Sequence, residues 1–277
     1  MPRNLTGRTI AITGASSGIG AAVAVACAEA GMHVALAARR VDRLEAVAEQ
    51  VRRIGSNAMV VRCDVTVDAD VESFVATAWR ELGGLDVAFA NAGYGLLRAV
   101  MDTTDAEARL MWETNYWGTL RLVRAVVPRM IERGCGHIVI NSSAASEIGI
   151  PMYSHYSATK AAQDSIAGAL RPELKAHGID VTSVHPIGTH THFFEQAAKR
   201  AGGNRTSLNT PKALMQQPDH VARCILRALR RPKPEVWPSR LARFGLALAT
   251  AFPRLGDRII QRQYRDSLRD VRRQGDA

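Results

Sequence analysis

Long apolar runs are absent from this chain of 277 residues. The longest late run, Phe244 to Phe252, is far shorter than the ~20 residues needed to cross a bilayer. The first residues, MPRNLTGRTIAITG, contain no apolar run of the length found in secretory signals. These absences predict a cytoplasmic protein without a membrane-spanning helix.

Cysteine is scarce as well. The four cysteines, at positions 27, 63, 135 and 224, form no CxxC pair, which argues against a zinc site or a redox motif. Cys27 lies in an apolar, helix-like segment and Cys63 at the end of a strand-like one. We therefore expect buried free thiols in a reducing compartment.

Acidic residues are few in the C-terminal part of the chain. The net charge is +10, and residues 221–277 contain 14 basic but only five acidic residues. The first 220 residues are therefore nearly neutral, and the basic part has few aromatic residues, which argues against nucleic-acid binding. Three interpretations of the basic tail stay open: an amphipathic helix docked on the body with its arginines in water, peripheral attachment to an anionic membrane, or contact with a partner.

Strand-like and helix-like segments alternate from residue 8 to about residue 237. Apolar residues make up 47% and charged residues 22% of the chain, as in soluble globular proteins. The alternation predicts an α/β fold, a single doubly wound parallel sheet with helices on both faces, over residues 1–238. A basic helical extension is expected over residues 239–277. The expected strands are 8–13, 33–38, 58–62, 86–89, 137–141, 179–184 and one near 236. The first expected helix follows the glycines and ends at residue 30, and the others cover 41–54, 69–82, 105–133, 154–177 and 219–231.

A glycine-rich turn follows the first expected strand. Its sequence, TGASSGIG, covers residues 13–20. Gly14 permits a tight turn, Gly18 permits the backbone to approach a pyrophosphate, and Gly20 permits the helix to pack closely. The free N–H groups of the following helix would face phosphates, so Ser16, Ser17 and Ile19 are candidate contacts too.

The second expected strand ends without a carboxylate. An acidic residue at this point would bind the ribose 2′-hydroxyl of NAD, but the chain has Arg39 and Arg40, and no carboxylate occurs before Asp42. The planar guanidinium of Arg39 suits a 2′-phosphate. We therefore expect NADP rather than NAD, with a solvated start of the next helix as the alternative role for these arginines.

Tyr156 and Lys160 are four residues apart in an expected helix, so both project from one face. A phenol with a pKa of ~10 is a poor acid–base catalyst near neutrality. A neighbouring ammonium is expected to lower that pKa and to tune the pair for carbonyl and alcohol chemistry. Tyr153 has no lysine at this spacing, because residue 157 is a serine.

These motifs, in this order, resemble the short-chain dehydrogenase/reductase family. The resemblance covers about residues 8–237 and includes the TGxxxGxG turn, Cys63-Asp64-Val65, Asn91-Ala92-Gly93, Asn115, Ser142-Ser143, the YxxxK motif, and Pro186 followed by Thr191. It implies a Rossmann-type fold and oxidoreductase activity with a nicotinamide cofactor. It also implies a homodimer or homotetramer, assembled through the helices expected over 105–133 and 154–177.

The resemblance also assigns roles to individual residues. Ser143 would hold the substrate oxygen beside the hydroxyl of Tyr156, with Ser142 as the alternative, and Asn115 would hold a water in a proton relay to Lys160. The expected cofactor contacts are Asp64 and Val65 to the adenine, Asn91, Ala92 and Gly93 near the ribose, Tyr156 and Lys160 at the nicotinamide ribose, and Pro186, Thr189 and Thr191 near the nicotinamide. The chain has Pro186-Ile187-Gly188 where the family usually has Pro-Gly, and isoleucine is poorly suited to positive φ, so this loop is expected to be reshaped.

The expected function is NADP(H)-dependent interconversion of a ketone or aldehyde with an alcohol, without a metal. Apolar residues in the loops around Leu96 and Ile150, and Phe193 and Phe194, suggest an apolar substrate, although the same side chains could simply pack the loops. His185, His190 and His192 form a second candidate cluster. The Pro186 break and the lack of nearby carboxylates in the sequence argue against a metal there. A non-catalytic NADP-binding sensor is the main alternative function.

Overall fold

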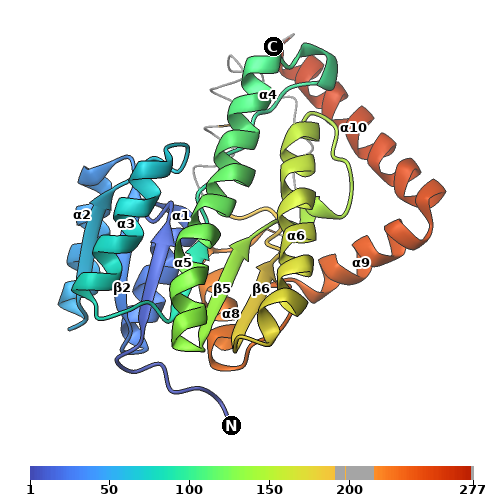
Figure 1. Cartoon of the computed structure of the whole chain (residues 1–277). Helices are drawn as coiled ribbons and strands as arrows, with labels where there is room; N and C mark the ends of the chain where they lie inside the picture. The colour runs from blue at the N-terminus through green and yellow to red at the C-terminus, as the bar shows by residue number, and fades with distance from the viewer. Residues whose placement is uncertain (191–196, 198–214, 276–277) are drawn as a thin grey trace.

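The computed structural model describes residues 1–190, 197 and 215–275 (Figure 1). Within these residues, seven parallel strands form one sheet in the order β3-β2-β1-β4-β5-β6-β7. The strands are β1 (Thr9–Thr13), β2 (His33–Ala38), β3 (Ala58–Arg62), β4 (Val87–Ala90), β5 (Gly136–Asn141), β6 (Ile179–Val184) and β7 (Glu235–Val236). The expected doubly wound sheet is confirmed, and its order reverses between β1 and β4.

Helices cover both faces of the sheet. One apolar core joins β1 and β2 to α1 (Gly18–Glu29), α2 (Val41–Arg53) and α8 (Pro218–Arg230). The other core joins the opposite face to α3 (Asp68–Glu81), α5 (Gly118–Arg133) and α6 (Ser154–Lys175). Alternate side chains of β1 supply the two cores, with Ile10 and Ile12 on one face and Ala11 on the other. The strand ends therefore present their loops at one edge of the sheet, where ligands bind in such folds.

The helix expected over residues 105–133 is interrupted. It consists of α4 (Asp105–Trp112), a π-helical turn η2 (Glu113–Trp117), and α5. Thr104 and Glu107 form a reciprocal capping box that fixes the start of α4. Two short 3-10 turns, η1 (Val100–Asp102) and η3 (Ala144–Ser146), lie in the loops that follow β4 and β5.

The basic extension consists of α9 (Arg240–Ala251) and α10 (Pro253–Gly275), which we call the C-terminal arm. In Figure 1 the two helices form a V beside α6. Three large apolar side chains of α9 are exposed, with 70% of Leu241, 70% of Phe244 and 41% of Leu248 in solvent, whereas Leu246 is half-buried. Only one side of α9, with buried Ala242 and half-buried Leu246, is docked on the body, and the stripe of Leu241, Phe244 and Leu248 is not. Within the described residues, no helix is both long and apolar enough to cross a membrane.

Candidate active site

The glycine turn lies between β1 and α1, as expected. Gly14 and Gly18 have positive φ angles of 67° and 59°. A Cβ on Gly14 would lie 2.8 Å from the Cα of Ala92, and a Cβ on Gly20 would lie 2.5 Å from the carbonyl oxygen of Gly14. Ser17 precedes α1 without a side-chain hydrogen bond to the helix, and the first turn contains no acidic residue. The turn thus leaves backbone N–H donors at the positive end of the helix dipole, which suits a phosphate.

Asn91 and Thr13 hold this turn in place. The Asn91 amide donates to the carbonyls of Thr13 (3.0 Å) and Gly14 (3.2 Å), and its Oδ1 accepts from Asn141 (2.9 Å). The Thr13 hydroxyl oxygen accepts from the backbone N–H groups of Asn91 and Ala92. The side chain of Asn91 therefore joins the ends of β1, β4 and β5, a structural role that the sequence motif did not reveal.

Arg39 and Arg40 both lie near the turn. Arg39 is 66% exposed, and its guanidinium lies 3.7 Å from the carboxylate of Asp64. Arg40 contacts the hydroxyls of Ser16 (3.3 Å) and Ser17 (3.5 Å). From the sequence, the 2′-phosphate was assigned to Arg39 alone, although the neighbouring Arg40 could have been proposed on the same grounds. Together the two guanidiniums place positive charge beside the turn, and Asp64 is the carboxylate that Arg39 faces.

Tyr156 and Lys160 project from the first turns of α6, with the Lys160 Nζ 5.6 Å from the centroid of the Tyr156 ring. Ser143 caps η3, and its side chain shares a hydrogen bond with Tyr156. Ser142, in contrast, donates to the Lys160 carbonyl at 2.9 Å and is buried. The geometry therefore brings Ser143, rather than Ser142, to the tyrosine.

Burial changes the acid–base properties of this pair. It raises the pKa of Tyr156 to about 12, against a smaller lowering by the hydrogen bond with Ser143. It lowers the pKa of Lys160 to about 7. The expected lowering of the phenol pKa is therefore wrong, because desolvation of the phenolate dominates. A protonated Tyr156 at neutral pH is a proton donor, which suits reduction of a carbonyl.

Asn115 lies in the π-helical turn and is fully buried. Its side chain donates to the Tyr94 carbonyl (2.9 Å) and to the Thr159 hydroxyl (3.0 Å), and it accepts from the Tyr94 N–H. Its backbone carbonyl accepts from Gln163 Nε2 at 2.7 Å, while Gln163 Oε1 accepts from Lys160 Nζ at 2.8 Å. The Gln163 side chain thus links the Lys160 ammonium to the backbone carbonyl of Asn115. Gln163 was missed, although it is seven residues from Tyr156 and so on the same helix face.

The remaining expected contacts lie around the same edge. Val65 is buried against Gly118, where an added Cβ would lie 2.7 Å from it, and Asp64 accepts from the Thr66 N–H at 3.0 Å. A Cβ on Gly93 would lie 3.1 Å from the Asn115 Oδ1 and 3.6 Å from the Lys160 Nζ. The backbone of Gly93 thus closes the site beside both side chains.

The loop after β6 is tied to Gln216. Ile187 N–H donates to the Gln216 side chain at 3.3 Å, and Thr189 forms a β-bridge with the same residue. Ile187 has no positive φ; within the described residues, Met152 is the one non-glycine residue that does. The loop therefore accommodates isoleucine without the strain expected for it. The Pro186 carbonyl accepts from the Ala144 N–H at 2.9 Å, and Thr191 lies outside the described residues.

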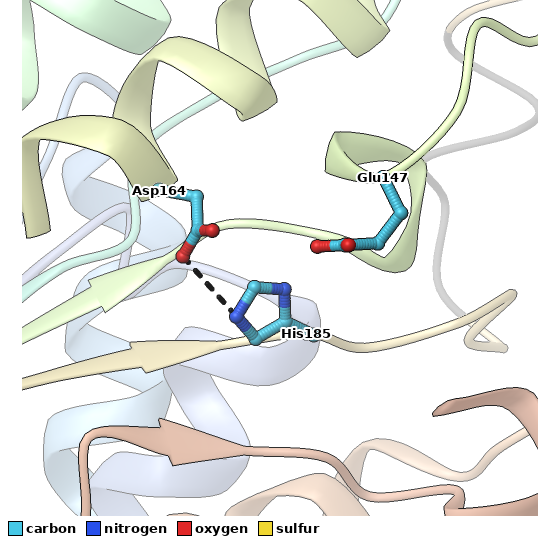
Figure 2. Close-up of side chains that lie close together, drawn as sticks. All are labelled: Glu147, Asp164 and His185. Carbon is cyan, nitrogen blue, oxygen red and sulfur yellow. Dashed lines mark ion pairs between the residues drawn. The ribbon is translucent and has the colours of Figure 1, made fainter. Parts of the chain in front are cut away.

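His185 lies between two carboxylates that sequence reasoning did not place there (Figure 2). Its Nε2 lies 3.3 Å from Asp164 and 3.0 Å from the Ser183 hydroxyl, while its Nδ1 lies 3.3 Å from the Ser146 hydroxyl. The ring stacks on Trp237 with centroids 4.3 Å apart. Both ring nitrogens are thus already engaged on opposite sides. The argument that carboxylates are lacking is wrong, because Glu147, Asp164 and His185 each offer one ligand atom and these atoms lie within 4.8 Å of one another. His190 contributes a backbone bond to Gln216, and His192 lies outside the described residues.

Comparisons with known proteins match most of the chain. A family model described as short chain dehydrogenase matches residues 8–202. A dehydrogenase/reductase SDR family member 7B from Danio rerio is 32% identical over 264 residues, covering 93% of this chain and 85% of the relative. A glycine betaine reductase ATRR from Emericella nidulans is 37% identical over 234 residues, but the chain spans only 18% of that relative's length.

A solved structure has the same fold. The crystal structure of a short-chain type dehydrogenase/reductase from Mycobacterium marinum superposes with a TM-score of 0.76 at 33% sequence identity. The match covers 84% of this chain and 94% of the other. It therefore includes most of the sheet and of the strand-end loops described above.

Proposed function

The chain belongs to the short-chain dehydrogenase/reductase family, whose oxidoreductases bind NAD or NADP, and we propose that it is an NADP(H)-dependent enzyme that interconverts a ketone or aldehyde with an alcohol. The observation that carries this proposal is the cluster of Ser143, Tyr156 and Lys160 beside the glycine turn. A non-catalytic sensor would not need a buried phenol and ammonium at the nucleotide end of the sheet.

The residues present fit a dinucleotide. The N-terminus of α1 offers N–H groups to the diphosphate, and Arg39 and Arg40 provide charge for a 2′-phosphate. Lys160 has three N–H donors, and the described residues supply protein oxygens to two of them, which leaves the third for a ribose hydroxyl. The proposed contacts are Gly14, Ser16, Ser17, Gly18, Ile19, Gly20, Arg39, Asp64, Val65, Asn91, Ala92, Gly93, Tyr156, Lys160, Pro186, Thr189 and Thr191.

A reduced nicotinamide held by these residues would supply a hydride to the carbonyl carbon. The hydroxyls of Ser143 and Tyr156 bind the carbonyl oxygen, and Tyr156 donates its proton as negative charge develops there. After donating its proton, Tyr156 is a phenolate, which the Lys160 ammonium stabilises. In alcohol oxidation the same groups act in reverse, with Tyr156 as the base.

An apolar wall supports an apolar substrate. Leu97 and Tyr153 form a small cluster, against which Ile150, Met152 and Tyr156 pack. A ketone with a fatty, terpenoid, steroid-like or aromatic body would bury its surface there. Phe193 and Phe194 lie outside the described residues. We further propose a homo-oligomer in which α5 and α6 form the interface, supported by the exposed Trp117 and Ile131.

A turnover screen tests this function. We expect the purified protein to oxidise NADPH in the presence of 2-decanone, acetophenone or a steroid ketone, measured by nicotinamide absorbance. We expect a lower KM for NADPH than for NADH, and Arg39→Ala to raise the KM for NADPH by about tenfold, since a charge-assisted contact contributes ~1.5–3 kcal/mol.

Arg53→Ala is the matched control, because Arg53 is an exposed arginine on α2 that pairs with Glu49. Its KM for NADPH should equal that of the wild type. Equal use of the two cofactors by both the wild type and Arg39→Ala would contradict the NADP assignment. NADPH binding without turnover of any ketone would favour the sensor.

A further inference from the structure

The ammonium of Lys160 is held by two oxygen atoms. Lys160 is 4% exposed, and its Nζ donates to the Asn141 carbonyl at 2.7 Å and to Gln163 Oε1 at 2.8 Å. The Asn141 carbonyl belongs to the end of β5, so the backbone fixes its position. Gln163 supplies the second acceptor from its side chain, three residues along the same helix.

The surroundings of Gln163 fix the direction of its amide. The side chain is fully buried, and Nε2 donates to the Asn115 carbonyl at 2.7 Å and to the Thr119 hydroxyl at 2.6 Å. The Thr119 hydroxyl uses its own hydrogen on the Asn115 carbonyl at 2.8 Å, so its oxygen must accept from Gln163. With both amide hydrogens engaged, Oε1 is the end that faces Lys160.

We propose that Gln163 is a positioning residue for the catalytic pair, because its amide ties the Lys160 ammonium to the π-helical turn and favours the protonated amine. The proposal rests on the proposed role of Lys160 in turnover. An acceptor beside a buried amine stabilises its charged form, which burial otherwise disfavours. Tyr156 is the titratable group that faces this ammonium from α6. The end of β5 faces it with the Asn141 carbonyl, and the η2 turn reaches it through Gln163, whose amide donates to the Asn115 carbonyl.

The test is a titration of Lys160 itself. The chain contains only five lysines, at positions 160, 175, 199, 212 and 233, so protein labelled with ¹³C-lysine gives few Cε resonances. Lys160→Arg identifies the signal of Lys160. We expect wild-type Lys160 to titrate at a pKa of about 7. Gln163→Glu should raise this pKa by about one unit or more, and Gln163→Leu should lower it.

The shifts in opposite directions distinguish this role from structural damage, which would move both variants the same way. Gln50→Glu, at an exposed position of α2, adds the same charge elsewhere and should leave the Lys160 titration unchanged. The pH at which ketone reduction declines should shift with the Lys160 pKa. Unchanged titrations in both variants would overturn the proposal, and shifted titrations without any ketone turnover would instead overturn the proposed function.

A second, independent observation concerns the C-terminal arm. Six large apolar side chains of the arm are exposed: Leu241, Phe244, Leu248, Phe252, Leu255 and Ile259. On α9, residues 241, 244 and 248 recur at helical spacing and form one stripe, whereas Ala242 is buried against the body. The apolar stripe of α9 therefore points away from the protein's own core.

The arm is strongly basic, with nine arginines against three aspartates over residues 240–275. Residues 239–256 contain arginines but no acidic residue, and Arg258, Arg262 and Arg265 follow on exposed positions of α10. Arg243 pairs at 3.4 Å with Glu235, which lies outside the arm. Within the arm, Asp257 is the only acidic residue before residue 266. A symmetric contact between two copies of the arm would bring arginines against arginines, which is unfavourable.

We propose that the C-terminal arm docks on an anionic membrane surface, with its apolar stripe among the acyl chains and its arginines at the headgroups. The arm also borders the catalytic loops, because the Tyr264 hydroxyl lies 3.8 Å from Met152 Sδ, in the loop that precedes Tyr156. Docking would thus bring the mouth of the site close to the membrane, in which an apolar ketone concentrates.

Vesicle co-sedimentation of the full chain tests this surface. We expect binding to phosphatidylcholine vesicles that contain phosphatidylglycerol and weaker binding to phosphatidylcholine alone. Replacing both Phe244 and Leu248 with serine should weaken binding by about 100-fold or more, because two large apolar side chains then no longer enter the acyl region. The matched control replaces Ile54 and Val67, which are exposed outside the arm, with serine.

Binding by the arm variant equal to that of the wild type would overturn the proposal. So would a wild type that stays in the supernatant with anionic vesicles. Light scattering gives a third result that would overturn the proposal. If the arm variant forms smaller oligomers than the wild type, and the wild type does not bind vesicles, the arm contacts a second copy of the chain instead.

Discussion

Tyr156→Phe is expected to lower kcat/KM for ketone reduction by about 10³-fold, at the middle of the range for losing a general acid. Phenylalanine keeps the ring, which packs beside Tyr153 with centroids 6.2 Å apart, but removes the proton that the oxyanion needs. NADPH should still bind with the wild-type dissociation constant, because the glycine turn and the arginines are unchanged. Steady-state turnover and fluorescence titration measure the two quantities separately.

Tyr153→Phe is the matched control for this prediction. Tyr153 is buried three residues away and also loses only a hydroxyl, yet it has no lysine one helical turn further on. It should retain most of the wild-type rate. Near-normal turnover by Tyr156→Phe, or an equal loss in both variants, would contradict the assignment of Tyr156 as the proton donor.

Lys160→Met is expected to lower kcat/KM by about 10²-fold or more and to remove the pH dependence near neutrality. Because burial lowers the pKa of Lys160 to about 7, the ammonium is present below that pH and lost above it. Tyr156 stays protonated throughout, since burial raises its pKa to about 12. Reduction by the wild type should therefore slow as the pH rises through about 7.

The control for Lys160 is Lys175→Met, at an exposed position near the end of the same helix. It should keep both the wild-type rate and the wild-type pH profile. The profile is measured as kcat/KM for one ketone between acidic and alkaline pH. A wild-type rate that rises through neutrality would show that the charged form of Lys160 is not the active one.

The sheet could be predicted from the sequence because its signal is local. Each strand is a short apolar run bounded by turn residues, and the alternation with helices leaves few topologies. The break at residues 113–117 could not be predicted in the same way. It is set by Asn115, whose side chain bonds the backbone of Tyr94 and the hydroxyl of Thr159, residues that are distant in sequence.

Most residues of the site could be predicted from the sequence, but their pKa values could not. Helical spacing places Tyr156 and Lys160 on one face, but spacing carries no information on burial, which reverses the expected direction of the phenol pKa. The choice between Ser142 and Ser143 depends on how β5 ends against α6. Gln163 has no motif, and its role follows only from contacts with two other segments.

The most direct test of the central claim follows an isotope through one turnover. NADPH that carries deuterium at the transferable C4 position is mixed with wild-type protein and acetophenone, and the product is analysed by mass spectrometry. The mechanism predicts one deuterium on the carbinol carbon of 1-phenylethanol, and an undetectable amount of this product with Tyr156→Phe over the same time. An unlabelled alcohol, or equal labelled product from Tyr156→Phe, would contradict hydride transfer coupled to a proton from Tyr156.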